Sequence, residues 1–130
     1  MARRIVILGS TGSIGRSTLD VVRRHAPAFE VVGLVAGRQV ERLAEQIREF
    51  HPKAVSVADE ASARELRRLL SGSVPEIRLG SQGAAEVAIG TGAEVVVAGI
   101  VGAAGLIPTL AAVSAGLVVA LANKEALVVA

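Results

Sequence analysis

Ile5-Val6-Ile7-Leu8-Gly9-Ser10-Thr11-Gly12-Ser13-Ile14-Gly15 is the stretch of sequence that decides the fold of this chain. It begins with an apolar run that is typical of a short buried strand. It then opens into Ile14, Thr18, Val21 and Val22, whose spacing places them on one face of a helix. A strand, a glycine turn and a helix in this order are typical of the first unit of a dinucleotide-binding fold.

The glycines of this turn have separate expected tasks. Gly9 permits a tight turn, Gly12 lets the backbone approach a diphosphate, and Gly15 lets the helix pack close to the strand. The helix start offers free N–H groups and the positive end of a dipole, and the turn holds no acidic side chain that would repel phosphate. The spacing G-x-x-G-x-x-G differs from the commoner G-x-G-x-x-G, so a purely structural turn is the alternative.

The remaining sequence alternates between apolar runs and helical stripes. Strands are predicted at residues 31–35, 54–57, 94–97 and 117–121, with a weaker one around 77–79. Helices are predicted over residues 40–50, 59–70, 81–89 and 106–113, with Pro108 in the first turn of the last one. Buried strands that alternate with helices indicate a parallel sheet. We therefore predict an α/β fold, a Rossmann-like doubly wound, mainly parallel sheet with helices on both faces.

Length and composition limit the classes of protein. A chain of 130 residues fits one domain, here residues 1–130, and hydrophobic residues make up 52% of it. The net charge is only +2, the basic residues are scattered, and Phe29 and Phe50 are the only aromatic residues, which argues against nucleic acid as a partner. The chain has no cysteine and no apparent targeting segment, so we expect a cytoplasmic protein.

A long uncharged stretch between Glu94 and Lys124 raises the question of a membrane span. Glycines and Pro108 interrupt it, and the chain has no tryptophan or tyrosine to mark a membrane interface. Strands and a small-residue helix, all buried in an α/β core, are the better interpretation, and we expect no membrane association.

The end of the second predicted strand bears on cofactor choice. It reads Val35-Ala36-Gly37-Arg38-Gln39 and lacks the carboxylate that accepts hydrogen bonds from the ribose in NAD-specific folds. Gly37 leaves space, the Arg38 guanidinium suits a 2′-phosphate, and Gln39 can add an amide hydrogen bond. We therefore predict NADPH rather than NADH, with Arg38 as a solvated surface charge the alternative.

A second candidate site follows the last predicted strand, at Ala122-Asn123-Lys124-Glu125. In open α/β sheets, ligands gather at the carboxyl ends of strands. The Lys124 ammonium could neutralise a phosphate or polarise a carbonyl, and the alternative is a charge in solvent at a helix start. His25 and His51 lack the spacing of metal ligands, so no metal site is predicted within this chain.

Several blocks of the sequence together resemble the 1-deoxy-D-xylulose 5-phosphate reductoisomerase family. The blocks occur in the order of that family and span residues 7–15, 17–22, 34–37, 100–106 and 121–125. The resemblance implies conversion of 1-deoxy-D-xylulose 5-phosphate into 2-C-methyl-D-erythritol 4-phosphate, an early step of isoprenoid synthesis. It also implies a rearrangement on a divalent metal, Mg²⁺ or Mn²⁺, followed by reduction with hydride from NADPH.

The resemblance further implies roles for individual residues. The expected contacts of the cofactor phosphates are Thr11, Gly12, Ser13 and Ile14. The 2′-phosphate would lie at Gly37, Arg38 and Gln39, although the family commonly has asparagine where Gln39 stands. Asn123 and Glu125 would lie on the nicotinamide side, and Lys124 would contact the phosphorylated sugar substrate.

The remaining expectations concern the complete protein. In the family, the metal ligands, the lid and the residues that bind the substrate phosphate lie beyond Ala130, and the sequence stops inside the apolar run 126–129. We therefore interpret the chain as a fragment that lacks the catalytic and C-terminal domains, inactive alone and part of a homodimer when complete. The alternatives are another NADP-dependent enzyme of related fold, such as an aspartate-semialdehyde dehydrogenase, and a stand-alone nucleotide-binding module.

Overall fold

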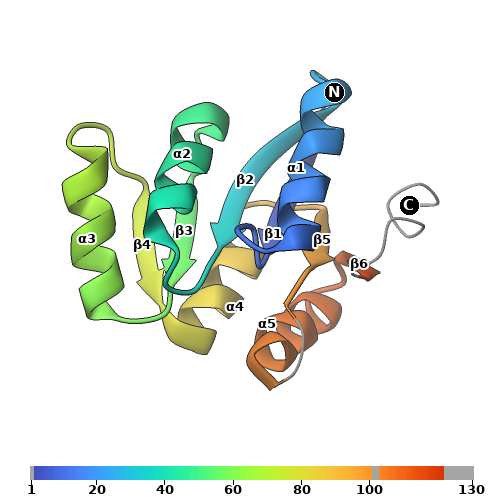
Figure 1. Cartoon of the computed structure of the whole chain (residues 1–130). Coiled ribbons are helices and arrows are strands. Elements are labelled where there is room, and N and C mark those ends of the chain that lie inside the picture. The colour runs from blue at the N-terminus through green and yellow to red at the C-terminus, as the bar shows by residue number, and fades with distance from the viewer. Residues whose placement is uncertain (1, 101–102, 122–130) are drawn as a thin grey trace.

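The computed structural model of this chain describes residues 2–100 and 103–121. Strands and helices alternate along this part of the chain, as predicted (Figure 1). The elements are β1 (Arg3–Leu8), α1 (Ser13–Arg24), β2 (Phe29–Val35), α2 (Val40–Phe50), β3 (Ala54–Val57), α3 (Glu60–Leu70), β4 (Glu76–Leu79), α4 (Gly80–Gly90), β5 (Val95–Ala98), α5 (Ala103–Ser114) and β6 (Val118–Leu121).

The strands form one 6-stranded sheet in the order β4-β3-β2-β1-β5-β6. Every neighbouring pair is parallel. The chain moves outward from β1 through β2 and β3 to β4, then returns to add β5 and β6 on the other side of β1. The direction therefore changes next to β1, and in sheets of this kind ligands bind outside the carboxyl ends of the strands at such a point.

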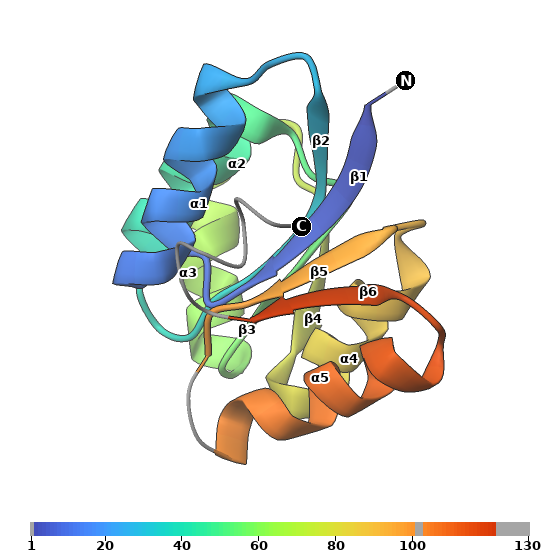
Figure 2. The same cartoon turned by 90° about the vertical axis from the view of Figure 1, so that its right-hand side faces the viewer.

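Helices cover both faces of the sheet. Helices α1, α2 and α3 lie on one face, and α4 and α5 lie on the other (Figures 1 and 2). Strand β1 serves both layers because successive side chains point to opposite faces. Ile5 and Ile7 belong to the core cluster that includes buried residues of α1 and α2, whereas Val6 and Leu8 belong to the cluster beneath α4. The doubly wound fold is confirmed.

Local sequence explains the helices on the first face. In α2, the buried residues Leu43, Ala44 and Ile47 recur at the spacing of one helix face. Helix α3 begins as predicted at an Asp59 cap, whose Oδ1 accepts a hydrogen bond of 2.9 Å from the backbone N–H of Ser62.

Helix α5 departs from the prediction in two ways. Pro108 lies inside α5 and not in its first turn, because the helix begins at Ala103. Near this start, a Cβ on Gly105 would lie 2.6 Å from the Ile100 carbonyl oxygen. The helix was expected to be buried in the core, but its residues Leu106, Leu110 and Val113 are 56%, 54% and 58% exposed. Within residues 2–100 and 103–121, no helix has the length and apolar content needed to cross a membrane.

Candidate functional site

The glycine turn connects the end of β1 to the start of α1. Gly9 has a φ of +80°, a left-handed conformation that glycine adopts without strain. The backbone N–H groups of Gly9 and Ser10 both donate to the Val35 carbonyl oxygen, at 2.8 and 2.9 Å, and that of Gly12 donates to the Gly9 carbonyl at 3.2 Å. The turn is therefore anchored to the end of β2, and the role predicted for Gly9 is confirmed.

Two glycines allow the turn to pack tightly. A Cβ on Gly15 would lie 2.2 Å from the Gly9 carbonyl oxygen and 2.5 Å from the Ser10 Cα. The sequence predicted that Gly15 lets α1 pack close to β1, but the close contact is with the turn that follows β1. A Cβ on Gly99, after β5, would lie 2.7 Å from the Leu8 carbonyl oxygen. The backbones of both connections therefore lie close together at the carboxyl end of β1.

The start of α1 has the donors that an anion requires. Gly12 is the N-cap residue, so no side chain caps the helix, and its first turn contains no acidic residue. Among the described residues, a Cβ on Gly12 would lie 3.6 Å from the Gly9 carbonyl oxygen and no closer to any other atom, so none of them fills this side of the turn. First-turn N–H groups without a cap attract negative charge.

The segment after β2 contains the residues predicted to select the cofactor. A Cβ on Gly37 would meet nothing within 4 Å. Gln39 is the N-cap residue of α2, and its side chain makes no capping hydrogen bond. The Arg38 side chain is 80% exposed, and its Nε lies 3.3 Å from Oδ2 of Asp59.

Asp59 is a carboxylate that sequence reasoning did not place near Arg38. It follows β3, and the parallel pairing of β2 with β3 brings the ends of these strands together. The backbone N–H of Ser62, and to a smaller extent the Arg38 guanidinium, lower the pKa of Asp59 below its ordinary value. Arg38 thus already has a carboxylate partner, and a phosphate bound to Arg38 would compete with Asp59 for the guanidinium.

A cleft of about 330 Å³ lies between the glycine turn after β1 and the segment after β2. Every strand from β1 to β5 contributes to it at or just after its carboxyl end. The lining residues are Gly9, Val35, Ala36, Gly37, Val57, Ala58, Gly80, Ser81, Ala84 and Ile100. The lining residues are small and mainly apolar. The sequence could have indicated them only through the general rule that ligands bind where the carboxyl ends of parallel strands converge.

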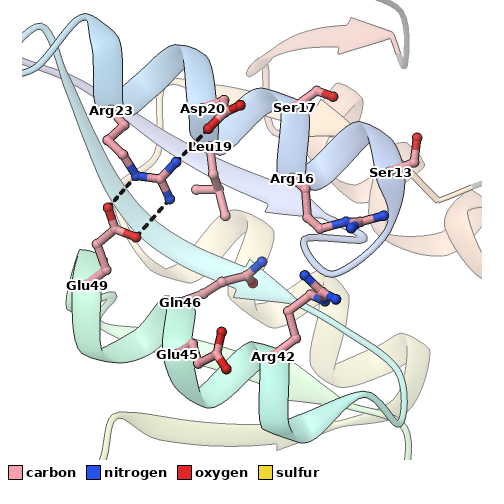
Figure 3. Close-up of a pocket in the computed structure, with 10 residues that line it drawn as sticks. All are labelled: Ser13, Arg16, Ser17, Leu19, Asp20, Arg23, Arg42, Glu45, Gln46 and Glu49. Atoms are coloured by element: carbon pink, nitrogen blue, oxygen red, sulfur yellow. Dashed lines mark hydrogen bonds and ion pairs between the residues drawn. The ribbon is translucent and has the colours of Figure 1, made fainter.

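A second hollow, of about 440 Å³, lies between α1 and α2 (Figure 3). Its outer end is closed by Arg23 of α1, which donates to Glu49 Oε1 of α2 at 2.8 Å and to Asp20 Oδ1 at 2.7 Å. The hydrogen bond from Arg23 lowers the pKa of Glu49. The arginines of this hollow are matched by Asp20, Glu45 and Glu49, so it carries no strong charge of one sign. The cleft at the strand ends is the better candidate site.

The structure brings most of the predicted cofactor residues to one edge of the sheet. Thr11, Gly12, Ser13 and Ile14 form the turn and helix start, and Gly37, Arg38 and Gln39 form the adjoining segment. Ser10, in the same turn, is wholly buried. Asn123, Lys124 and Glu125 lie outside the described residues. The described residues contain no group of three or more potential metal ligands.

Comparisons with known proteins agree with this geometry. Residues 5–130 match the family model described as 1-deoxy-D-xylulose 5-phosphate reductoisomerase. A curated protein of that name from Prosthecochloris aestuarii is 60% identical over 128 residues, which cover 98% of this chain and 34% of the relative. The chain therefore spans about a third of the length of the curated relatives that it matches.

Two solved structures resemble the chain over almost its entire length. The reductoisomerase from Zymomonas mobilis in complex with NADPH has a TM-score of 0.87 and 42% identity, covering 100% of this chain and 34% of that one. A DOX-P reductoisomerase in complex with magnesium has a TM-score of 0.86 and 37% identity, covering 98% of this chain and 32% of that one. Fold, motif order and sequence identity agree, and the chain belongs to the 1-deoxy-D-xylulose 5-phosphate reductoisomerase family.

Proposed function

We propose that this chain is the NADPH-binding part of an enzyme that converts 1-deoxy-D-xylulose 5-phosphate into 2-C-methyl-D-erythritol 4-phosphate. One observation carries the proposal: in a member of this family, Gly9 of the uncapped glycine turn and Gly37 after β2 line the same mainly apolar cleft. The similar protein from Zymomonas mobilis was solved with NADPH. Family membership also favours this enzyme over an aspartate-semialdehyde dehydrogenase or a separate binding module.

The residues present fit the adenine half of NADPH. The N–H groups at Ser13 and Ile14 would donate to the diphosphate, which can approach because Gly12 has no side chain. The small, apolar walls of the cleft suit the adenosine. The Arg38 fork and the Gln39 amide would bind the 2′-phosphate, with Thr11 beside the diphosphate. In the enzyme, NADPH supplies the hydride for the reduction.

The other assignments concern residues or chains outside the described part. We propose that Asn123 and Glu125 lie on the nicotinamide side and that Lys124 contacts the phosphorylated sugar. A divalent metal, Mg²⁺ or Mn²⁺, would be bound by residues beyond Ala130 in a cytoplasmic homodimer. We accordingly expect the 130-residue chain to show no turnover when it is supplied with Mg²⁺, NADPH and substrate.

Titration of the chain with NADPH and NADH tests the cofactor assignment. We expect NADPH to bind more tightly, because only NADPH has the 2′-phosphate that Arg38 can bind through charge-assisted hydrogen bonds. Arg38→Ala should weaken the binding of NADPH about tenfold and leave the binding of NADH nearly unchanged. The difference between the two affinities should therefore become smaller. Equal affinities of the unmodified chain for both cofactors would refute the assignment.

Asp59→Asn provides the matched control for charge. Asparagine caps a helix about as well as aspartate, so α3 should keep its start. Removing the carboxylate 3.3 Å from Arg38 Nε should tighten NADPH a few-fold and leave NADH unaffected. A weaker affinity for NADPH would show that Asp59 orients Arg38 instead of competing with the phosphate.

A further inference from the structure

A buried glutamine of α2 connects that helix to the glycine turn. Gln46 is only 7% exposed, and its Nε2 donates a hydrogen bond of 2.9 Å to the Ser10 carbonyl oxygen. It shares the inner side of α2 with Leu43 and Ile47, at positions that otherwise hold apolar residues. Figure 3 shows its amide directed from α2 toward the turn at the start of α1.

This bond completes the anchoring of the turn. On one side of Ser10, the N–H groups of Gly9 and Ser10 donate to the Val35 carbonyl at the end of β2. On the other side, the Ser10 carbonyl accepts from Gln46. Both anchors belong to elements that flank residues 37–39, namely the last residue of β2 and helix α2. The proposed diphosphate and 2′-phosphate contacts are thus mechanically connected.

The amide of Gln46 has no other bonding task in the described residues. Its Oε1 has no hydrogen-bond partner there, and neither does the Ser10 hydroxyl. A buried acceptor without a partner costs free energy, so an apolar side chain of similar size would suit α2 better if packing alone mattered. The contact with the Ser10 carbonyl is what the glutamine supplies.

We propose that Gln46 is a positioning residue for the cofactor diphosphate. By fixing the Ser10 carbonyl, it fixes the peptide planes that follow, and so it keeps the N–H groups of Ser13 and Ile14 directed at the phosphates. The inference rests on the proposed function, because it assumes that NADPH is the ligand of the turn. Gln46 acts through the backbone of the turn and does not touch the cofactor.

The first experiment compares two ligands on Gln46→Met. NADPH uses both the turn and the segment around Arg38, whereas adenosine 2′-monophosphate has the 2′-phosphate but no diphosphate. We expect Gln46→Met to weaken NADPH about tenfold and to change the affinity for adenosine 2′-monophosphate less than twofold. Ile47→Met, a change of similar volume and no charge at the buried neighbour on the same helix, should change neither affinity.

A second variant supplies a pH signature. In Gln46→Glu, an ionised carboxylate faces the Ser10 carbonyl and cannot donate a hydrogen bond. At pH 8, NADPH should therefore bind to Gln46→Glu more weakly than it binds to Gln46→Met. A protonated carboxyl can donate again, and burial favours that form. Below about pH 5.5 the affinity should therefore return to within about threefold of the unmodified chain at the same pH.

The outcomes separate this inference from the proposed function. If the unmodified chain does not bind NADPH, the proposed function and this inference both fail. If it binds but Gln46→Met binds NADPH equally well, only the inference fails. An equal loss of NADPH and adenosine 2′-monophosphate, or no pH-dependent recovery in Gln46→Glu, would show a general structural role and also overturn it.

Discussion

The two faces of the sheet are covered by helices of different character. Helices α1, α2 and α3 are amphipathic, and their outer sides carry ion pairs such as that of Arg23 with Glu49. Helices α4 and α5 consist mainly of small and apolar residues, with Glu86 as their single charged residue. Their outer surface exposes Ile89, Leu106, Ile107, Leu110 and Val113.

The difference shows that an apolar, buried inner side does not determine whether the outer side of a helix is charged or apolar. The face with α1 to α3 has the charged exterior that suits contact with water. The exterior of α4 and α5 is apolar over several adjacent residues, a property typical of surfaces that another protein segment covers. The residues proposed to bind the cofactor lie at the sheet edge between the two layers and depend on the packing of both.

The largest effect is expected where a glycine of the first face is replaced. Gly15→Ala would place a Cβ 2.2 Å from the Gly9 carbonyl oxygen, and both atoms belong to a backbone that cannot move freely. We expect a loss of more than about 3 kcal/mol in the free energy of unfolding, measured by urea titration. Gly90→Ala at the end of α4 is the control, because its Cβ meets nothing within 4 Å. It should leave stability equal or slightly higher.

A smaller contrast is expected for leucines of the two layers. Leu66 of α3 is wholly buried, so Leu66→Ala should cost about 2–5 kcal/mol of unfolding free energy. Leu110 of α5 is 54% exposed, and Leu110→Ala should cost less than about 0.5 kcal/mol. Thermal and urea unfolding of both variants measure this difference. Similar losses in the two variants would mean that α5 buries its outer stripe in this chain.

The smallest effect concerns acid pH and belongs to the charged face. The pKa of Glu49 is lowered in the folded chain, so its pair with Arg23 stabilises the fold above the ordinary pKa of glutamate. This contribution is lost as the pH falls through the lowered pKa. Glu49→Gln should therefore reduce stability near neutral pH and flatten its decline between roughly pH 5 and 3.

The controls for the pH experiment use the same helices. Asp59 and Glu65 also have lowered pKa values, so part of the acid-dependent decline should remain in Glu49→Gln. Glu45→Gln removes a charge of α2 that makes no ion pair within the described residues and should keep the original slope. An unchanged slope in Glu49→Gln would show that the pair with Arg23 does not contribute.

The sequence predicted the elements and the position of the glycine turn between β1 and α1 correctly because these depend on local patterns. Apolar runs, helix spacing and the glycines around Gly9 are readable without tertiary information. The exposure of Leu110 could not be predicted in this way, since an apolar stripe has the same spacing whether it packs against a core or against a later segment. The approach of Asp59 to Arg38 depends on β3 pairing with β2, and the bond from Gln46 to Ser10 depends on how α2 packs against the turn.

The most direct test is a titration of the isotopically labelled chain with NADPH, followed by the backbone amide NMR signals. We expect the largest shifts at Gly12, Ser13 and Ile14 and at Gly37, Arg38 and Gln39. Residues on the outer side of α5, such as Leu110, should show none. Shifts confined to the hollow between α1 and α2, for example at Asp20 and Glu49, or no shifts at millimolar NADPH, would contradict it.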